Sequence, residues 1–290
     1  MKIKWIGTHS AFAFNAGPGT EKCFQSSFVV ERGAKKLCVD FGGTGAAALR
    51  EHYGVYNADL GDIDAFYITH LHADHIAGLE HLALCTYYNP NARKPKLFGD
   101  ANLLDELWSD SLAGGLKTIE NKDAVLGTFF DVYPIERNGG FVWEGVAFWT
   151  VQSVHIVSGR IIRNSYGLIM SYIEDPDSQD NELRMLRGGV EEPTCGETIY
   201  FTSDTQFCPN QIQAFYSEAD IIFQDGENTP YKSNVHAHYN DLKTLPLSTR
   251  EKMWLFHYAP GPNHEGAKKD GFAGFIEQGQ EFEIHYRQNT

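Results

Sequence analysis

Hydrophobic and polar positions along the chain follow two spacings, one typical of β-strands and one typical of helices. In the first half, short apolar runs separated by turns predict strands at Ile3–Ile6, Ser27–Glu31, Leu37–Phe41, Ile63–Thr69 and Lys96–Gly99. Helical spacing predicts helices over Ala46–His52, Ile76–Tyr88 and Ala101–Ala113. Because strands and helices alternate in this way, the first half indicates an α/β architecture.

The second half repeats this style without repeating the sequence. Strands are predicted at Val142–Ser153, Tyr166–Ile173, Glu197–Ser203, Ala219–Gln224 and Met253–His257, and helices at Cys208–Ser217 and Leu242–Lys252. The length of 290 residues allows one large domain or two fused halves. Since no sharp linker is visible, we expect a single domain over residues 1–290 with one insertion, an exposed acidic loop at Glu174–Glu197.

Composition and charge narrow the class of protein. The hydrophobic share of 42% is typical of a globular protein, and no apolar run reaches transmembrane length. Five cysteines without CxxC spacing favour reduced thiols in a cytoplasmic protein. The formal net charge of −14 repels polyanions and argues against a large nucleic-acid footprint. A small anionic substrate stays compatible with this charge, because bound cations would restore a positive potential in one cleft.

The densest candidate chemistry is the cluster His70-Leu71-His72-Ala73-Asp74-His75, which directly follows a predicted strand. His70 and His72 alternate on one face and can bind one ion, whereas Asp74 and His75 fall on the following turn and can bind a second. Imidazole and carboxylate together suit zinc, iron or manganese better than calcium or magnesium. The alternative is a polar loop at a helix start, but four ligating side chains within six residues favour a metal site.

Three further candidates, His155, Asp204 and His257, each stand at the end of a predicted strand. Layered α/β proteins place much of their chemistry where strands give way to loops. A single histidine in such a place is more commonly a solvated or capping residue. Together with the HxHxDH cluster, however, the three residues predict one shared metal site.

The order HxHxDH, His, Asp, His on alternating strands resembles the metallo-β-lactamase superfamily. The opening Ile6-Gly7-Thr8-His9-Ser10-Ala11-Phe12 is similar to the start of its phosphodiesterase branch, which includes ribonuclease Z, although His9 stands where that branch often has glycine. The resemblance covers nearly the whole chain and implies an αββα sandwich of two mixed sheets flanked by helices. It also implies two divalent ions, foremost Zn²⁺ with Mn²⁺ or iron as alternatives. One ion would be bound by His70, His72 and His155 and the other by Asp74, His75 and His257, with Asp204 bridging both.

The segment Asn234–Leu242 separates the branches of this superfamily. In the ribonuclease Z branch a non-ligand histidine near this position assists the leaving group, and His236 and His238 are both candidates for that role. A third metal site and a polar turn are the alternatives. Asp225 or Glu227 could orient the assisting histidine, as carboxylates behind a site commonly do, or could serve only loop hydrogen bonding.

The runs His236–Pro246 and Lys252–Tyr258 most resemble the anti-Pycsar enzymes, phage and bacterial phosphodiesterases that destroy cyclic-nucleotide signals. This resemblance implies a homodimer that opens a cyclic nucleotide to a linear monophosphate in the cytoplasm, or in the host cytoplasm if a phage encodes it. Asp74 would orient the attacking hydroxide, and His236 or His238 would protonate the leaving 3′ oxygen.

Other functions share the same predicted metal ligands. Ribonuclease Z-like cleavage of transfer-RNA 3′ ends normally needs a basic, glycine-rich arm between the positions of His155 and Asp204, and here that interval carries the acidic stretch Glu174–Glu197. Thioester or lactone hydrolysis has no need of the His236 and His238 segment. A non-catalytic protein that sequesters a ligand usually lacks a metal ligand, and none is missing here.

Overall fold

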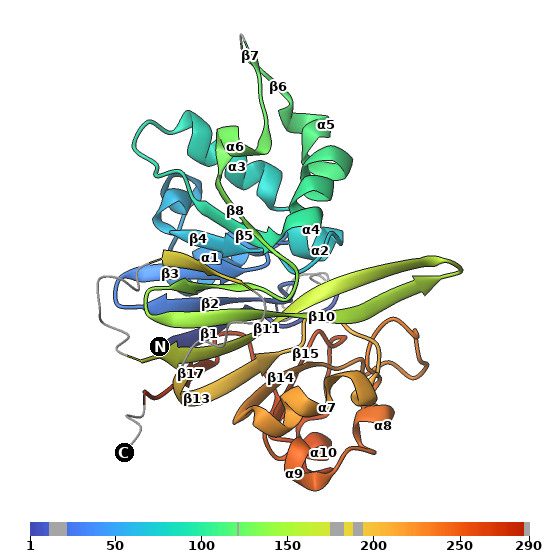
Figure 1. The fold of residues 1–290 in the computed structure, drawn as a ribbon. Helices are drawn as coiled ribbons and strands as arrows, with labels where there is room; N and C mark the ends of the chain where they lie inside the picture. Colours follow the sequence, from blue (N-terminus) through green and yellow to red (C-terminus); the bar gives the residue numbers. More distant parts are fainter. Residues whose placement is uncertain (12–21, 121, 175–182, 188–193, 287–290) are drawn as a thin grey trace. The chain divides into compact units, whose positions relative to one another are not determined.

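The computed structural model describes residues 1–11, 22–120, 122–174, 183–187 and 194–286 (Figure 1). Its internal contacts define two compact units, and each unit contains one mixed β-sheet. The first unit comprises most of the chain up to Arg137 together with Gln278–Glu283. The second comprises most of the chain between Asn138 and Glu277, with short segments after Gly7 and from Ile284. The prediction of a single domain stays a prediction.

The sheet of the first unit has the strand order β17-β1-β2-β3-β4-β5-β8. Its strands are β1 (Lys2–Gly7), β2 (Ser27–Arg32), β3 (Lys35–Val39), β4 (Ala65–Tyr67), β5 (Lys96–Asp100), β8 (Asp131–Ile135) and β17 (Glu281–Glu283). The first strands pair in antiparallel fashion, whereas β3, β4, β5 and β8 are parallel neighbours. Parallel neighbours end at the same edge of a sheet, so the residues after β3 and β4 lie close together.

The helical segments of this unit are α1 (Gly45–Tyr53), the 3₁₀ helix η1 (Asn57–Asp62), α2 (Ala73–Ile76), α3 (Leu79–Tyr88), α4 (Ala101–Glu106), the π-helix η2 (Leu107–Leu112), α5 (Ala113–Leu116) and α6 (Leu126–Phe129). The short strands β6 (Thr118–Ile119) and β7 (Lys122–Asp123) form a hairpin between α5 and α6. The helix predicted over Ile76–Tyr88 ends where expected but begins later, because α3 starts at Leu79 and Ile76 ends the separate helix α2. Gly78 lies between them so close to the backbone that a Cβ atom there would be 2.6 Å from the oxygen of Gly42.

The sheet of the second unit has the strand order β12-β9-β10-β11-β13-β14-β15-β16. Its strands are β9 (Gly140–Trp143), β10 (Val146–Ser158), β11 (Ile161–Ile173), β12 (Leu183–Leu186), β13 (Thr194–Phe201), β14 (Ile221–Asp225), β15 (Met253–Phe256) and β16 (Gly274–Phe275). Strands β10 and β11 form a long hairpin that extends beyond the other strands of this sheet (Figure 1). Strands β13 to β16 are parallel neighbours, and the chain between them forms α7 (Pro209–Glu218), α8 (Tyr239–Leu242), α9 (Leu247–Arg250) and α10 (His264–Lys269).

Three predictions for this unit need correction. The strand predicted over Val142–Ser153 is two strands, joined by a turn at Glu144 and Gly145 whose φ angles of 50° and 75° are typical of a type I′ hairpin. The helix predicted over Leu242–Lys252 is interrupted, because Pro246 cannot donate a helical hydrogen bond. Of the predicted acidic loop, residues 175–182 and 188–193 lie outside the described residues, and Leu183–Leu186 pairs with β9 as a strand.

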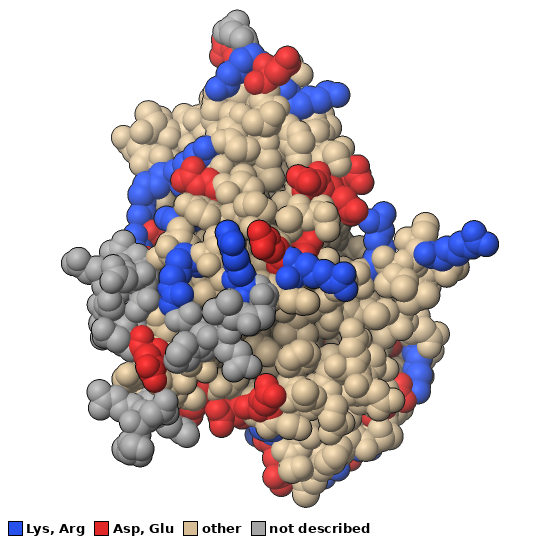
Figure 2. Space-filling view, in the orientation of Figure 1, with Lys and Arg blue, Asp and Glu red and all other residues tan. Residues whose placement is uncertain are grey.

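The surface carries charges of both signs. On the face shown in Figure 2, the Lys and Arg side chains lie interspersed with Asp and Glu side chains. Within the described ranges, no helix combines the length and the hydropathy of a membrane span.

Candidate metal ligands and proton donor

Three neighbouring strands of the second unit end in acidic or imidazole side chains. Asp204 follows β13, Asp225 ends β14 and His257 follows β15. Because these strands are parallel, the three side chains meet at one edge of the sheet. His257 Nε2 lies 3.3 Å from Asp204 Oδ2, and His257 Nδ1 lies 3.7 Å from Asp225 Oδ1. The structure therefore brings the side chains of Asp204 and His257 together at this edge.

His155 reaches the same edge from β10 through a β-bulge. The register between β10 and β11 shifts between Val154 and Ile156, so His155 is the extra residue, and a bulge of this kind re-aims a side chain. His155 Nδ1 donates to the carbonyl of Val235 at 2.8 Å, while its Nε2 lies 3.9 Å from Asp204 Oδ2. Burial holds the pKa of His155 below its ordinary value despite the opposing charge of Asp204. This favours the neutral imidazole that a metal ion needs.

His236 lies beside these residues and is held by a buried carboxylate. Its Nδ1 lies 2.8 Å from Asp225 Oδ2, and its ring stacks on that of His257 with centroids 4.6 Å apart. Burial lowers the pKa of His236, but the charge and hydrogen bond of Asp225, with the charges of Asp204 and Glu227, outweigh it and raise the pKa to about 9. Asp225 thus orients His236 and favours its protonated form.

His238, the other candidate for assisting a leaving group, caps a helix instead. Its side chain is buried, its Nδ1 accepts from the backbone N–H of Asn240 at 3.2 Å, and its Nε2 donates to the carbonyl of Thr229 at 2.9 Å. Both ring nitrogens are engaged by the backbone, which makes His238 a poor proton donor. Glu227 stabilises the loop between β14 and α8, because its carboxylate accepts a hydrogen bond from the N–H of Ser233 at 3.0 Å.

In the first unit, the HxHxDH cluster begins just beyond β4. The Nε2 atom of His70 and the Nδ1 atom of His72 face each other at 3.1 Å. Two nitrogens that bind one tetrahedral zinc ion at about 2.0–2.1 Å lie roughly 3.3 Å apart, so this spacing fits a shared ion. The hydroxyl of Thr69 donates its proton to Asp40 and accepts from His70 Nδ1 at 2.9 Å, which places the lone pair of His70 on Nε2.

Asp40, at the end of β3, organises this cluster and was missed in the sequence. Its carboxylate accepts from His75 Nδ1 at 2.7 Å, from the N–H of Thr69 at 2.9 Å and from the hydroxyl of Thr69 at 2.8 Å. His75 then directs its Nε2 to within 3.3 Å of Asp74 Oδ2. The available signal was a charged residue directly after the apolar run Leu37–Val39.

Three of these strand ends have a left-handed backbone at residues other than glycine. The φ angles are 60° at Asp40, 55° at Ser203, which precedes Asp204, and 60° at His257. A left-handed conformation costs an ordinary L-residue about 1–2 kcal/mol, and such strain is typically found at functional sites. The left-handed backbone at these strand ends is therefore consistent with a role in orienting the side chains of the site.

The donor chemistry of both units fits divalent cations. The first unit brings together His70, His72, Asp74 and His75, and the second brings together His155, Asp204 and His257. His70, His75 and His155 each have one ring nitrogen held by an oxygen atom, the arrangement that metal-binding histidines commonly show. These His and Asp clusters support the binding of divalent metal.

Comparisons with known proteins identify the relatives of this chain. The family model described as anti-Pycsar protein Apyc1 matches residues 1–282. The anti-Pycsar protein Apyc1 of Paenibacillus xerothermodurans is 30% identical over 263 residues, which cover 89% of this chain and 88% of the relative. The protein of the same name from Bacillus phage vB_BveM-Goe7 is 27% identical, with 97% of each chain covered.

Solved structures identify the fold. The metallo-β-lactamase fold protein YhfI from Bacillus subtilis aligns with a TM-score of 0.63 at 14% identity, over 97% of this chain and 98% of that chain. The zinc-bound PqqB from Methylobacterium extorquens aligns with a TM-score of 0.67 at 11% identity, over 98% of this chain and 100% of that chain. The chain has the metallo-β-lactamase fold, and the α/β prediction is confirmed.

Proposed function

Since the chain belongs to the anti-Pycsar Apyc1 family, we propose that it is a metal-dependent phosphodiesterase that hydrolyses cyclic nucleotides to linear monophosphates. The observation that carries this proposal is the pair formed by Asp225 and His236 beside Asp204. It offers an oriented proton donor next to a candidate metal ligand. A phosphodiester whose leaving group is a sugar alkoxide needs such a donor, whereas a thioester releases a thiolate that does not.

Seven side chains are proposed to hold two divalent ions: His70, His72, Asp74, His75, His155, Asp204 and His257. Zinc suits this imidazole-rich donor set, with manganese or iron as alternatives. When bound, such ions supply Lewis acidity and lower the pKa of the attacking water. The carboxylate of Asp74, besides binding, would orient that water for attack on phosphorus.

His236 is proposed to protonate the departing 3′ oxygen. Asp225 holds Nδ1 of the ring, so Nε2 is the atom that gives up the proton. The side chain of His236 is 19% exposed, whereas Asp225 is completely buried, so a substrate can reach the imidazole but not the carboxylate behind it. His238 is not proposed to act in catalysis, because its two nitrogens hold the loop and cap α8.

A small substrate is favoured over a structured RNA. The net charge of −14 opposes the phosphate contacts on which binding of long nucleic acids depends. A cyclic nucleotide carries a single phosphate, whose charge two bound cations can offset. Ribonuclease Z-like activity remains the alternative to be tested.

The decisive test is a side-by-side assay on metal-loaded protein with a panel of cyclic nucleotides, a precursor transfer RNA and a thioester, with metal content measured in the same samples. We expect turnover of cyclic nucleotides and little cleavage of the other two. Preferred cleavage of the transfer RNA or the thioester would contradict the proposal. Full metal loading without turnover of any ester would favour a protein that sequesters its ligand.

Family resemblance also leads us to propose a homodimer that acts in the cytoplasm, which would be that of the host for a phage-encoded protein. One of the relatives above is encoded by a Bacillus phage. Light scattering on the eluting protein tests the dimer, because a mass near twice 32.6 kDa is expected. A mass near 32.6 kDa would contradict it.

A further inference from the structure

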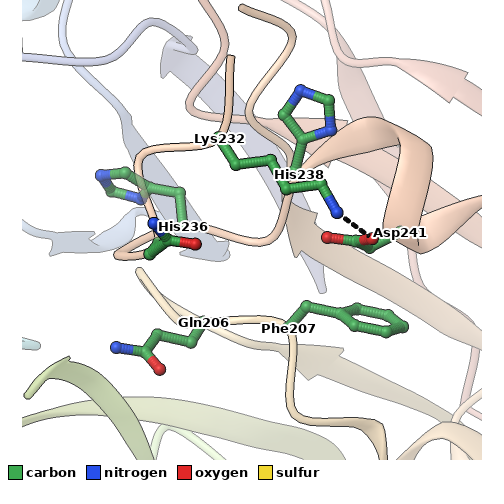
Figure 3. Close-up of a pocket in the computed structure, with 7 residues that line it drawn as sticks. Gln206, Phe207, Lys232, His236, His238 and Asp241 are labelled. Atoms are coloured by element: carbon green, nitrogen blue, oxygen red, sulfur yellow. Dashed lines mark hydrogen bonds and ion pairs between the residues drawn. The ribbon is translucent and has the colours of Figure 1, made fainter.

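A cavity of about 210 Å³ lies beside His236, within the second unit. Figure 3 shows Gln206 and Phe207 on one side of it, across from His236, His238 and an ion pair between Lys232 and Asp241. Pockets that enclose a whole small ligand commonly measure about 300–1,000 Å³. This cavity is smaller, so it fits one part of a nucleotide rather than all of it.

The chemistry of a cyclic diester indicates which part of the nucleotide this cavity would hold. In a 3′,5′-cyclic nucleotide the departing oxygen stays attached to the ribose, which also carries the base. A proton donor for that oxygen must therefore face the nucleoside and not a detached leaving group. His236 both carries the proposed proton and lines the cavity, so the nucleoside belongs on this side of the imidazole.

The lining suits an uncharged aromatic ring. Phe207 is partly buried and packs against the hydrophobic cluster that contains Tyr200, Ile212 and Leu255, which keeps its ring in place. The ammonium group of Lys232 lies 2.5 Å from the carboxylate of Asp241, so the two charges offset each other.

Two amide side chains add hydrogen-bonding capacity without charge. Gln206 is fixed, because its Nε2 donates to the carbonyl of His155 at 3.0 Å, and Asn234 lies on the opposite loop. Among the lining residues, Lys232 is paired with Asp241 and His236 with Asp225, so a phosphate would find no uncompensated cation there. A nucleobase, which is flat, apolar on its faces and polar at its edges, matches the cavity better.

We propose that this cavity is the nucleoside subsite and that Phe207 is the surface on which the base stacks. This inference rests on the proposed phosphodiesterase function and deepens it, because it makes Phe207 a residue that binds the base of the substrate. Stacking is tolerant of base identity, since every base has an aromatic face. The subsite therefore predicts the acceptance of several bases with similar efficiency.

The test compares variants on substrates with and without a nucleoside. Phe207→Ala removes the ring, Phe207→Tyr keeps it, and Phe215→Ala is the matched control, since Phe215 packs on the same cluster but does not line the cavity. The substrates are cyclic CMP, cyclic AMP and the cyclic phosphate of 1,3-propanediol, which has the six-membered diester ring without sugar or base.

Phe207→Ala should lower kcat/KM for both cyclic nucleotides about 10-fold, chiefly through KM, because stacking on an aromatic side chain contributes about that factor. It should change turnover of the propanediol ester less than about 2-fold, and Phe207→Tyr and Phe215→Ala should resemble the wild type on all three substrates. Full retention of nucleotide turnover by Phe207→Ala, or an equal loss on all substrates, would overturn the subsite and leave the phosphodiesterase intact. A metal-loaded wild type that opens no cyclic diester would remove the proposed function, and the subsite with it.

Discussion

Replacement of Asp225 by asparagine tests the proton donor most directly, because the amide keeps the shape of the side chain and removes its charge. In the native protein, Asp225 Oδ2 lies 2.8 Å from His236 Nδ1 and accepts from the N–H of Thr205 at 2.9 Å. A hydrogen bond to a charged group contributes about 1.5–3 kcal/mol, against about 1 kcal/mol between neutral groups. The variant should therefore stabilise the imidazolium less by about 0.5–2 kcal/mol, which corresponds to a rate factor of roughly 2 to 30.

The assay separates this effect from a general disturbance of the site. Asp225→Asn should lower kcat/KM by this factor on cyclic nucleotides, whose alkoxide leaving group needs a proton. On bis-p-nitrophenyl phosphate it should change little, because p-nitrophenolate leaves without protonation. Glu227→Gln is the comparison variant, since Glu227 bonds to the loop at Ser233 and acts on His236 only through its charge, so it should discriminate between the substrates much less than Asp225→Asn does. An equal loss on both substrates, with full metal content, would refute the proton-donor role.

Further variants test the other parts of the site. Asp204→Ala should abolish both metal binding and hydrolysis, since it removes the proposed shared ligand, and retained activity with full metal content would contradict the dinuclear assignment. Asp40→Asn should weaken metal affinity about 10- to 100-fold in a chelator titration, because Asp40 holds His75 in place, and unchanged affinity would deny it that role. Ser203→Gly should raise the free energy of unfolding by about 1 kcal/mol, or roughly 2–4 °C in Tm, because glycine relieves the left-handed backbone there. A lower Tm would show that the Ser203 side chain stabilises the folded state by more free energy than the left-handed backbone costs.

The fold and the local part of the site could be predicted from sequence because their signals are short-range. Apolar runs mark the strands, and β1, β2, β5 and β14 lie within one or two residues of their predicted ends. The cluster from His70 to His75 is visible because the spacing of its side chains is itself the signal. The start of one predicted helix is misplaced at Gly78, where the backbone is closely packed, and another predicted helix is interrupted before Pro246.

The choice between close alternatives could not be made from sequence. His236 and His238 stand two residues apart, and so do Asp225 and Glu227. Which of the two carboxylates contacts which of the two histidines depends on the conformation of the loop after β14. That loop is held by contacts between distant positions such as Asn228 and Ala259. These contacts leave no periodic trace in the sequence.

The hydrogen bonds of the second unit link its candidate metal ligands to the proposed proton donor in one network. Asp225 accepts from both His236 and Thr205, and Thr205 directly follows Asp204. His155 donates to the carbonyl of Val235, which directly precedes His236. If His155 or Asp204 shifts when an ion binds, we expect the loop that carries His236 to shift with it. Because these groups are positioned as a unit, the effects of removing them singly should not add, and the position of the proton donor depends on the metal ligands themselves.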